Sequence, residues 1–410
     1  MARKTLGDVA DYINGRAFKP IEWETTGKPI IRIQNLTNSS TEINRTTKTF
    51  EEKYSVRAGD LLFAWSASLG AYIWNGEDGW LNQHIFKVIP KKDISKKYLY
   101  YYLLHVVDQL YAKAHGSGMV HITIKPFKAT TIPLPPLPEQ QRIVDRIESL
   151  FAKLDEAKQK AQDALDSFET RKAAILHKAF TGELTAQWRK EHGVGMESWA
   201  RHPLKDVTQI GSGGTPSRKN SQYYLGDILW VKTGEIYWNY IYDSEEKITE
   251  EAIANSSAKL YPAGTVLVAM YGQGLTRGRS AILGVPATTN QAVCALQPCD
   301  RLGNRYLYYY FMANYWEYRE KAVGGNQPNY SATMIGKWII NIPSVLEQAE
   351  IVRILDDLLA KEQQAKEVAE AVLEQIDLIK KSILARAFRG ELGTNDPAEE
   401  SAVELVRNII

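Results

Sequence analysis

The chain contains only two cysteines in 410 residues, Cys294 and Cys299, and no histidine lies near them in the sequence. Two such thiols can form neither a disulfide framework nor a four-ligand zinc site, so both are expected to be reduced and structural. The first residues lack the apolar core of a signal peptide, and no run approaches the roughly 18 apolar residues of a membrane span. We therefore expect a cytoplasmic protein with two or three domains of about 150 residues each.

Motifs that would carry catalysis are also missing. The sequence has no G-x-x-x-x-G-K-[ST] phosphate loop, no G-x-S-x-G serine elbow and no H-x-x-x-H pair. The diproline Pro135-Pro136 follows a leucine, unlike the acidic-or-amide, Pro-Pro, aromatic motif of amino-methyltransferases. Gly272 and Gly274 follow a strand-like run, but no correctly spaced third glycine and no long helix come after them, which argues against a dinucleotide loop. We expect no catalytic residue and no metal or cofactor site in this chain.

The most informative feature that is present is a long internal repeat. Three residue pairs recur at an offset of 208 residues: Asn82-Gln83 as Asn290-Gln291, Tyr98-Leu99 as Tyr306-Leu307, and Glu139-Gln140 as Glu347-Gln348. Upstream the offset shortens to 205 (Ala58 to Ala263) and then to 198 (Leu6 to Leu204). Each copy therefore keeps its length towards its end, whereas the upstream loops differ.

Each copy begins with a mixed segment. Strand-like runs at residues 29–33, 60–64 and 265–270 alternate with turns rich in glycine, asparagine, serine and proline. Ser95 is expected to cap a helix that extends to His115, and Asn304 its counterpart, which extends to about residue 323. The tyrosines of these helices are expected to pack in the core. The fold class is α+β, with two similar mixed α/β domains.

A long helical segment follows in each copy. Proline-rich residues 132–138 precede the first helix and Gly182 ends it, while Pro343 and Gly390 bound the second. Apolar residues recur about every 3.5 positions over more than three heptads, which indicates a coiled coil. Each helix of about 44 residues would be roughly 65 Å long. The two helices match in length, so we expect an intramolecular antiparallel coiled coil; a coiled coil between two chains is the alternative.

A second set of apolar residues lies outside this heptad seam. It is expected to bind helices of a partner, or to be buried under the chain's own mixed domains. The set consists of Val144, Phe151, Leu165, Leu176, Val352, Leu359, Val368, Leu373 and Leu384.

Polar and basic residues gather in the loops of the mixed segments. Glycine lets a backbone approach phosphates, lysine and arginine neutralise them, and arginine, glutamine and asparagine can contact base edges in the major groove. The loops therefore suit duplex DNA, although any one of them could be an ordinary solvated loop. The candidates are Arg16, Lys19, Trp65, Ser66, Ser68, Ser117, His121, Lys125, Ser212, Thr215, Ser217, Arg218, Lys219, Tyr271, Gln273, Thr276, Arg277, Arg279, Gln327, Asn329 and Tyr330.

The repeat, together with the motif at residues 132–140 and the closing motifs at 178–184 and 386–392, resembles the specificity subunit of type I restriction-modification systems. The likeness spans nearly the whole chain. It implies target recognition domains at residues 1–137 and 203–345, conserved long helices at 138–184 and 346–392, a linker at 185–202 and a C-terminal tail at 393–410.

The resemblance also implies a function and a set of partners. Each recognition domain would read one half of a bipartite double-stranded DNA target, while the helices would set the spacing and dock two modification subunits. Those partners would carry S-adenosylmethionine and methylate adenine, and motor-nuclease subunits would join them for restriction. The half-sites are expected to differ, because residues 65–67 stand where the second copy has residues 271–273.

Two alternatives stay open at this point. One is a self-contained DNA methyltransferase with a fused recognition domain, which S-adenosylmethionine binding to the isolated chain would reveal. The other is a coiled-coil adaptor that binds no DNA, which a salt-dependent gel shift with duplex DNA would distinguish.

Overall fold

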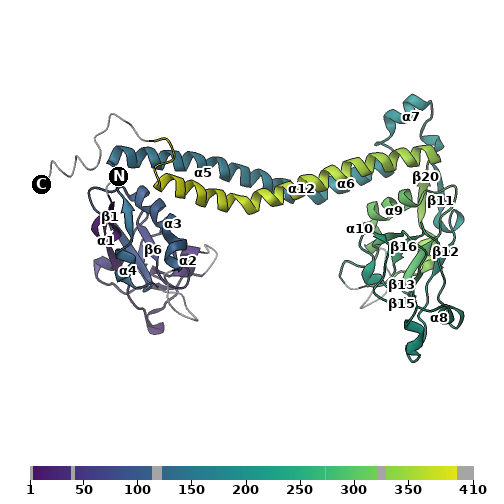
Figure 1. Cartoon of the computed structure of the whole chain (residues 1–410), viewed down its shortest axis with the longest axis horizontal. Coiled ribbons are helices and arrows are strands. Elements are labelled where there is room, and N and C mark those ends of the chain that lie inside the picture. Colours follow the sequence, from purple (N-terminus) through teal and green to yellow (C-terminus); the bar gives the residue numbers. More distant parts are fainter. Residues whose placement is uncertain (1–2, 38–41, 113–121, 273, 321–328, 395–410) are drawn as a thin grey trace. The chain divides into compact units, whose positions relative to one another are not determined.

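The computed structural model describes residues 3–37, 42–112, 122–272, 274–320 and 329–394 (Figure 1). Its internal contacts divide the chain into two units, residues 1–162 with 370–410 and residues 163–369. We call these unit 1 and unit 2 and describe each by itself. In both units, a domain of small sheets and short helices packs against segments of long helices through one hydrophobic core.

Unit 1 is built on a four-stranded antiparallel sheet in the order β2-β9-β6-β7, beside a second sheet in the order β4-β3-β8-β5. The strands are β1 (Arg3–Thr5), β2 (Ala10–Asn14), β3 (Lys28–Ile31), β4 (Arg45–Thr46), β5 (Ser55–Val56), β6 (Leu61–Ala64), β7 (Gly70–Ile73), β8 (Gly79–Leu81), β9 (Ile85–Pro90) and β10 (Thr131–Pro133). The helices are α1 (Leu6–Val9), α2 (Ile33–Thr37), α3 (Lys96–Ala112), α4 (Ile124–Lys128) and α5 (Leu137–Asp166), which ends in unit 2. β1 pairs with β10, just before α5 begins.

Unit 2 repeats this plan with a five-stranded sheet, β12-β19-β16-β17-β14, and a three-stranded sheet, β15-β13-β18. The strands are β11 (Ala200–Pro203), β12 (Ile210–Ser212), β13 (Ile228–Val231), β14 (Tyr240–Ile241), β15 (Lys247–Ile248), β16 (Val266–Ala269), β17 (Ser280–Leu283), β18 (Thr288–Thr289), β19 (Val293–Leu296) and β20 (Ile339–Ile342). The helices are α6 (Phe168–Phe180), α7 (Ala186–His192), α8 (Glu250–Ala254), α9 (Asn304–Ala313), α10 (Tyr315–Glu320), α11 (Ala332–Gly336) and α12 (Val345–Phe388), whose second half belongs to unit 1.

The tyrosine-rich runs fill the two cores, as the sequence predicts. Tyr98 on α3 and Tyr306 on α9 are almost fully buried. Their hydroxyls donate to equivalent carbonyls, those of Pro133 at 2.9 Å and Asn341 at 2.7 Å. Burial raises the pKa of both tyrosines above the ordinary value, so they stay neutral donors. Both cysteines are free, and burial raises the pKa of Cys294 to about 12.

The long helices pair within the chain and run antiparallel, which confirms the predicted intramolecular coiled coil. In unit 1, residues 143–147 of α5 pack in one core with residues 384–388 of α12, and Lys380 lies 2.6 Å from Asp155. In unit 2, Arg171 of α6 lies 2.8 Å from Glu362 of α12, and residues 176–179 share a core with residues 351–355. Figure 1 shows α12 beside α5 in one unit and beside α6 in the other.

Two helices are shorter than the sequence predicts. The first long helix is interrupted at Ser167, whose hydroxyl and backbone amide both donate to the Asp163 carbonyl, at 2.6 and 3.1 Å; a side-chain bond to the carbonyl four residues earlier often bends a helix. The helix from residue 304 stops at Asn314, whose side-chain amide donates to the Tyr310 carbonyl at 2.8 Å; the expected continuous helix to residue 323 is therefore wrong. By contrast, Ser95 caps α3 by accepting from the Tyr98 amide at 3.1 Å.

The linker predicted at residues 185–202 is a folded segment that contains α7 and the start of β11. Its Arg189 is buried, because it reaches the first turn of α12. The other proposed domain boundaries remain predictions. None of the helices within the described ranges has the length and apolar composition needed to cross a membrane.

Candidate nucleic-acid interface

The strand order of unit 1 collects candidate residues at one end of its main sheet. β2 and β6 both run antiparallel to β9, with Asn14 opposite Phe86 and Ala64 opposite Ile85. The last residues of β2 and β6 therefore lie beside the first two residues of β9. The connections that carry Arg16, Trp65 and Gln83 all leave the sheet at this end, which we call the loop end of unit 1.

Unit 2 has the same arrangement. Ser212 at the end of β12 lies opposite Cys294, and Ala269 at the end of β16 lies opposite Val293 of β19. Thr215, Gln291 and the loop of residues 270–279 consequently lie at the loop end of unit 2. The Thr215 hydroxyl donates to the Gln291 side-chain oxygen.

A glycine at the same place in each copy makes this arrangement possible. A Cβ on Gly15 would lie 1.9 Å from the Asn82 carbonyl oxygen, and one on Gly213 would lie 2.0 Å from that of Thr289. The amide of Gly15 donates to the Ile85 carbonyl at 3.0 Å, and that of Gly213 donates to the Val293 carbonyl at 3.4 Å. Only glycine allows the loop to pass this close to the neighbouring backbone.

The residue after this glycine differs between the copies: it is Arg16 in unit 1 and Gly214 in unit 2. Arg16 donates to both Glu22 oxygens, at 3.1 and 2.8 Å, and its guanidinium carbon lies 4.2 Å from the centre of the Phe50 ring. Hydrogen bonds from the Arg16 side chain and the Lys19 backbone lower the pKa of Glu22 to about 2. The arginine is thus held in one orientation while part of its side chain stays exposed.

Trp65 forms an aromatic corner at the loop end of unit 1. Its indole N–H donates to Asn14 at 3.0 Å, and its ring stacks on Phe86 with a centroid distance of 5.7 Å. An open cavity of about 340 Å³ lies between these three residues and residues 122–124. The strand register pairs Trp65 with Met270, because both amides bond to equivalent carbonyls, those of His84 and Ala292. This corrects by one residue the expected match of residues 65–67 with 271–273.

The loop between β16 and β17 in unit 2 is longer than its counterpart in unit 1. It covers residues 270–279, whereas the connection between β6 and β7 covers residues 65–69. Helix α10 holds the longer loop: Arg319 donates to the carbonyls of Arg277 at 2.7 Å and Gly274 at 2.8 Å. The Arg279 guanidinium carbon lies 4.8 Å from the centre of the Tyr237 ring. The basic loop is therefore anchored through its backbone.

Arg218 is engaged within unit 2, beside the second sheet. It donates to Glu246 at 2.5 and 3.2 Å, and its guanidinium carbon lies 4.1 Å from the centre of the Tyr224 ring. Lys232 donates to the same carboxylate at 2.9 Å. Hydrogen bonds from Arg218 and Lys232 lower the pKa of Glu246 to about 2. Arg218 therefore already has a charged partner, although about half of its side chain is exposed.

The structure places the other candidates in three groups. Ser66 and Tyr330 are buried, and the Tyr330 ring packs on Trp338. Neither side chain is at the surface, which corrects the prediction that they contact DNA. Exposed or partly exposed candidates are Lys19, Ser68, Lys125, Ser217, Lys219, Tyr271, Thr276 and Asn329. Ser117, His121, Gln273 and Gln327 lie outside the described residues.

Sequence reasoning missed two exposed glutamines at the loop ends, Gln83 and Gln291. The signal was available, since each follows an asparagine that recurs in the repeat. The backbone amide of Asn82 donates to the Ile31 carbonyl at 3.1 Å, and that of Asn290 to the Val231 carbonyl at 3.0 Å. Their side-chain oxygens accept from the backbone amides of Gln83 at 2.7 Å and Ala292 at 3.1 Å. Each asparagine thereby ties the loop end to the second sheet of its unit, and the glutamine after it faces solvent.

The opposite end of each main sheet is attached to the long helices by a buried glutamine. In unit 1, Gln140 donates to the Asp93 carbonyl at 2.8 Å and accepts from the Ser95 amide at 2.8 Å. In unit 2, Gln348 donates to the Arg301 carbonyl at 3.0 Å and accepts from the Gly303 amide at 2.8 Å. These carbonyls and amides follow the last residues of β9 and β19, so the loop end and the helix end of each domain are separate.

The nine apolar residues proposed for partner binding do not form one exposed stripe. Val144 and Leu384 are buried in the core of unit 1 and Leu176 in that of unit 2, so for these three the partner assignment is wrong and burial under the chain's own domains is observed. Phe151, Val352 and Leu359 are partly buried against the same cores. Leu165 and Leu373 are half-buried, and Val368 is exposed, as are Leu378 and Ile379 on α12.

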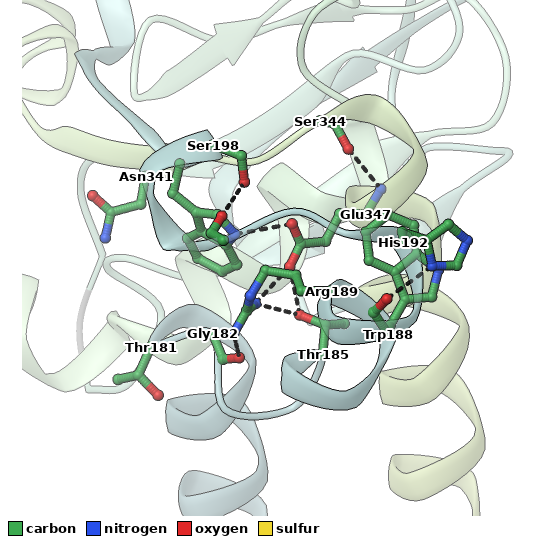
Figure 2. Close-up of polar contacts among 12 residues, drawn as sticks. Thr181, Gly182, Thr185, Trp188, Arg189, His192, Ser198, Asn341, Ser344 and Glu347 are labelled. Carbon is green, nitrogen blue, oxygen red and sulfur yellow. Dashed lines mark hydrogen bonds and ion pairs between the residues drawn. The ribbon is translucent and has the colours of Figure 1, made fainter.

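A buried carboxylate, Glu347, lies at the start of α12. It accepts hydrogen bonds from Thr185 and Arg189, as Figure 2 shows, and from Trp199; all three lie in the segment between α6 and β11. Its counterpart in unit 1 is Glu139, which is 4% exposed and bonds to Arg142 and Thr394. The recurrence of this residue was visible in the sequence, but its partners were not.

Each unit therefore combines a mixed domain, which has separate loop and helix ends, with a pair of long helical segments. A family model for the type I restriction modification DNA specificity domain matches residues 1–165 and 196–373. The chain therefore belongs to the family of type I restriction-modification DNA specificity subunits.

Individual relatives agree with this assignment. The specificity subunit of the type I restriction enzyme EcoBI from Escherichia coli is 25% identical over 97% of this chain and 87% of its own length. That of MjaIX from Methanocaldococcus jannaschii is 32% identical over 45% of this chain and 44% of its own length. The crystal structure of an HsdS subunit from Thermoanaerobacter tengcongensis has the same fold, with a TM-score of 0.64, 19% identity, and coverage of 95% of this chain and 97% of that one.

Proposed function

We propose that this chain recognises an asymmetric, bipartite double-stranded DNA target, with one half-site read by the loop end of each unit. The observation that carries the proposal is the repeated division of each domain into a loop end and a helix end. Basic, amide and aromatic side chains gather at the loop end, and a buried glutamine joins the helix end to the coiled coil.

The residues at the loop ends have the chemistry that duplex DNA requires. Arg16, Arg277 and Arg279 would contact guanine edges or phosphates, while Gln83 and Gln291 would contact bases or the backbone in the groove. The two loop ends present different side chains, since Arg16 corresponds to Gly214 and Trp65 to Met270. Different surfaces support unlike half-sites.

The paired helices would set the spacer between the half-sites and dock two modification subunits. Val368, Leu378 and Ile379 are exposed apolar residues on α12, which suits a partner surface. α12 has 44 residues, about 66 Å at 1.5 Å per residue. Half-sites of 3 to 5 pairs with centres about one duplex turn apart would leave a spacer of roughly 5 to 8 base pairs.

Catalysis would belong to the partners. The modification subunits would bind S-adenosylmethionine and methylate adenine, and restriction subunits with motor and nuclease activity would complete the assembly. The complex would act in the cytoplasm, where chromosomal DNA is accessible. The curated relatives are specificity subunits of restriction enzymes, which favours this division over a self-contained methyltransferase or an adaptor that binds no DNA.

The test is methylation of duplex DNA by the full chain assembled with its modification subunits. We expect methylation of one bipartite sequence, lost when either half-site is scrambled and lost when this chain is omitted. The isolated chain should bind duplex DNA with an affinity that falls as salt rises, and should not bind S-adenosylmethionine. Methylation by the isolated chain, or methylation indifferent to one half-site, would contradict the proposal.

A further inference from the structure

Glu347, at the start of α12, is a fully buried carboxylate (Figure 2). It accepts hydrogen bonds from three residues of the segment between α6 and β11. One oxygen of Glu347 accepts from the Thr185 hydroxyl at 2.7 Å and from an Arg189 guanidinium nitrogen at 2.6 Å. The other oxygen accepts from the Trp199 indole N–H at 3.0 Å. We call Thr185, Arg189, Trp199 and Glu347 the bracket.

Arg189 adds a fourth attachment to this cluster. Its second terminal nitrogen donates to the carbonyl of Gly182 at 2.5 Å, and Gly182 follows the C-terminal end of α6 with a positive φ of 83°. A Cβ on Gly182 would lie 2.6 Å from the Met196 sulfur and 3.2 Å from this guanidinium, so the glycine gives room to both side chains. The bracket therefore links the segment that follows α6 to the first turn of α12.

The bracket also lies where the mixed domain of unit 2 begins. Trp199 immediately precedes β11. The chain runs from α6 through α7 to β11, which pairs with β20, and β20 leads into α12. The hydrogen bond from Trp199 to Glu347 links the start of β11 to the start of α12. This link lies where the domain leaves the helices, beside the Gln348 hydrogen bonds and the shared core of unit 2.

Stability alone is a weak reason for such a cluster. Burying an ion pair costs desolvation that its attraction often fails to repay, and well-packed apolar residues can replace it without loss. What a buried pair with defined hydrogen bonds does supply is one permitted geometry, because any other leaves a charge without a partner. Arg189 contributes through a planar fork that fits only one arrangement of acceptors.

Unit 1 provides the contrast. Glu139 accepts from Arg142, which is three residues away on its own helix, and from the Thr394 hydroxyl at 2.6 Å. In unit 1 the arginine belongs to the same helix as the carboxylate, whereas in unit 2 it comes from the segment that connects α6 with the second domain. The ion pair between residues distant in the sequence is found only in unit 2, within the described residues of these two sites, where the chain continues from α6 into the second domain.

We infer that Glu347 is a positioning residue for DNA recognition: through Arg189 and Trp199 it fixes the direction of the second recognition domain on the helices, and hence the spacer length that the protein accepts. This inference rests on the proposed function. One extra base pair displaces a half-site by about 3.4 Å and rotates it by about 35° around the duplex, so a domain held rigidly should reject it.

The experiment measures spacer discrimination by the complex of the full chain with its modification subunits. The cognate duplex, found by sequencing methylated genomic DNA, is compared with duplexes whose spacers are one or two pairs shorter or longer. The variants are Glu347→Gln, Arg189→Met and Trp199→Phe, the last of which keeps the ring and removes the indole N–H. Arg353→Met is the matched control, because Arg353 pairs with Glu350 at the surface of the same helix.

We expect the ratio of methylation rates, cognate over altered spacer, to fall by about tenfold in the bracket variants, comparable to the cost of one mismatched pair. Both half-site sequences should stay unchanged, and Arg353→Met should keep the wild-type ratio. If Trp199→Phe and Arg189→Met slow all substrates by one common factor, with melting temperature lowered in parallel, the bracket is merely structural and the inference is wrong. An unchanged ratio also overturns it. A wild-type complex indifferent to one half-site contradicts the proposed function instead.

Discussion

The two recognition domains share a framework and differ at their loop ends. Both keep a glycine at a position where a Cβ would meet a neighbouring carbonyl, an asparagine whose backbone amide bonds to the second sheet, and a glutamine that anchors the helix end. At the loop ends, however, Arg16 of the first copy corresponds to Gly214 of the second. The β16–β17 loop covers residues 270–279, whereas the corresponding loop of the first copy covers residues 65–69. Framework positions are fixed by backbone geometry, whereas loop positions are free to differ with the target.

The largest expected effect comes from breaking the shared framework. Gly15→Ala and Gly213→Ala each place a Cβ within about 2 Å of a backbone carbonyl oxygen, so each should lower the free energy of unfolding of its own unit by at least about 3 kcal/mol. Gly234→Ala is the control, because a Cβ there meets nothing within 4 Å. Thermal melting of the three variants checks this. Equal melting of Gly213→Ala and Gly234→Ala would contradict the close approach.

The next effect separates the two halves of α12. Leu378 lies in unit 1 and Val368 in unit 2, and both are exposed. If each helps to dock one modification subunit, Leu378→Glu and Val368→Glu should each weaken assembly, since burying such a side chain contributes about 1.5 to 3 kcal/mol. Native mass spectrometry should find the complex with one modification subunit for either variant. Full assembly of both, with unchanged circular dichroism, would remove these residues from the partner surface.

A smaller effect tests whether each loop end acts on its own half-site. Arg16→Ala should relax one base of the first half-site, because a bidentate arginine contact contributes about 1 to 3 kcal/mol of discrimination. Arg277→Ala or Arg279→Ala should relax the second half-site only. If the arginine contacts phosphate, affinity should fall equally for all sequences, with a weaker salt dependence. Methylation of a library randomised at both half-sites measures this, and relaxation of the distant half-site would contradict the assignment.

Much of this architecture could be predicted from sequence, because a heptad pattern and a 208-residue offset depend on local or repeated residues. Tyrosines such as Tyr98 were correctly expected in the core. The interruption at Ser167 was missed, since a serine hydroxyl facing its own helix looks the same in sequence as one facing solvent. The partners of Glu347 lie more than 140 residues away in the chain, so no spacing rule could find them.

Candidate site residues were harder to predict, because polarity alone does not decide exposure. Tyr330 resembles a surface residue in the polar run that contains it, yet its ring packs on Trp338. Gln83 was overlooked although it recurs as Gln291. Position in the strand register, rather than residue type, decides which side chains reach the loop ends.

The smallest expected effect concerns pH. Glu22 and Glu246 both have a pKa lowered to about 2 by hydrogen bonds from arginine, so the folded state holds these carboxylates ionised more strongly than the unfolded state. Their contribution to stability is therefore fully present above about pH 4.5 and is lost as pH falls towards about 2. DNA binding should not change between pH 8 and 5 through these two groups. Destabilisation by Glu22→Gln or Glu246→Gln should shrink below pH 4.5; an effect that grows on acidification would contradict the pairing.

The most direct test of the central claim, that two unlike domains read two unlike half-sites, is methylome sequencing of cells with and without this gene. We expect one adenine-methylated motif to disappear with the gene, and that motif to consist of two different half-sites separated by a fixed spacer of unspecified bases. A palindromic motif, or a set of methylated sites that is the same with and without the gene, would contradict this account.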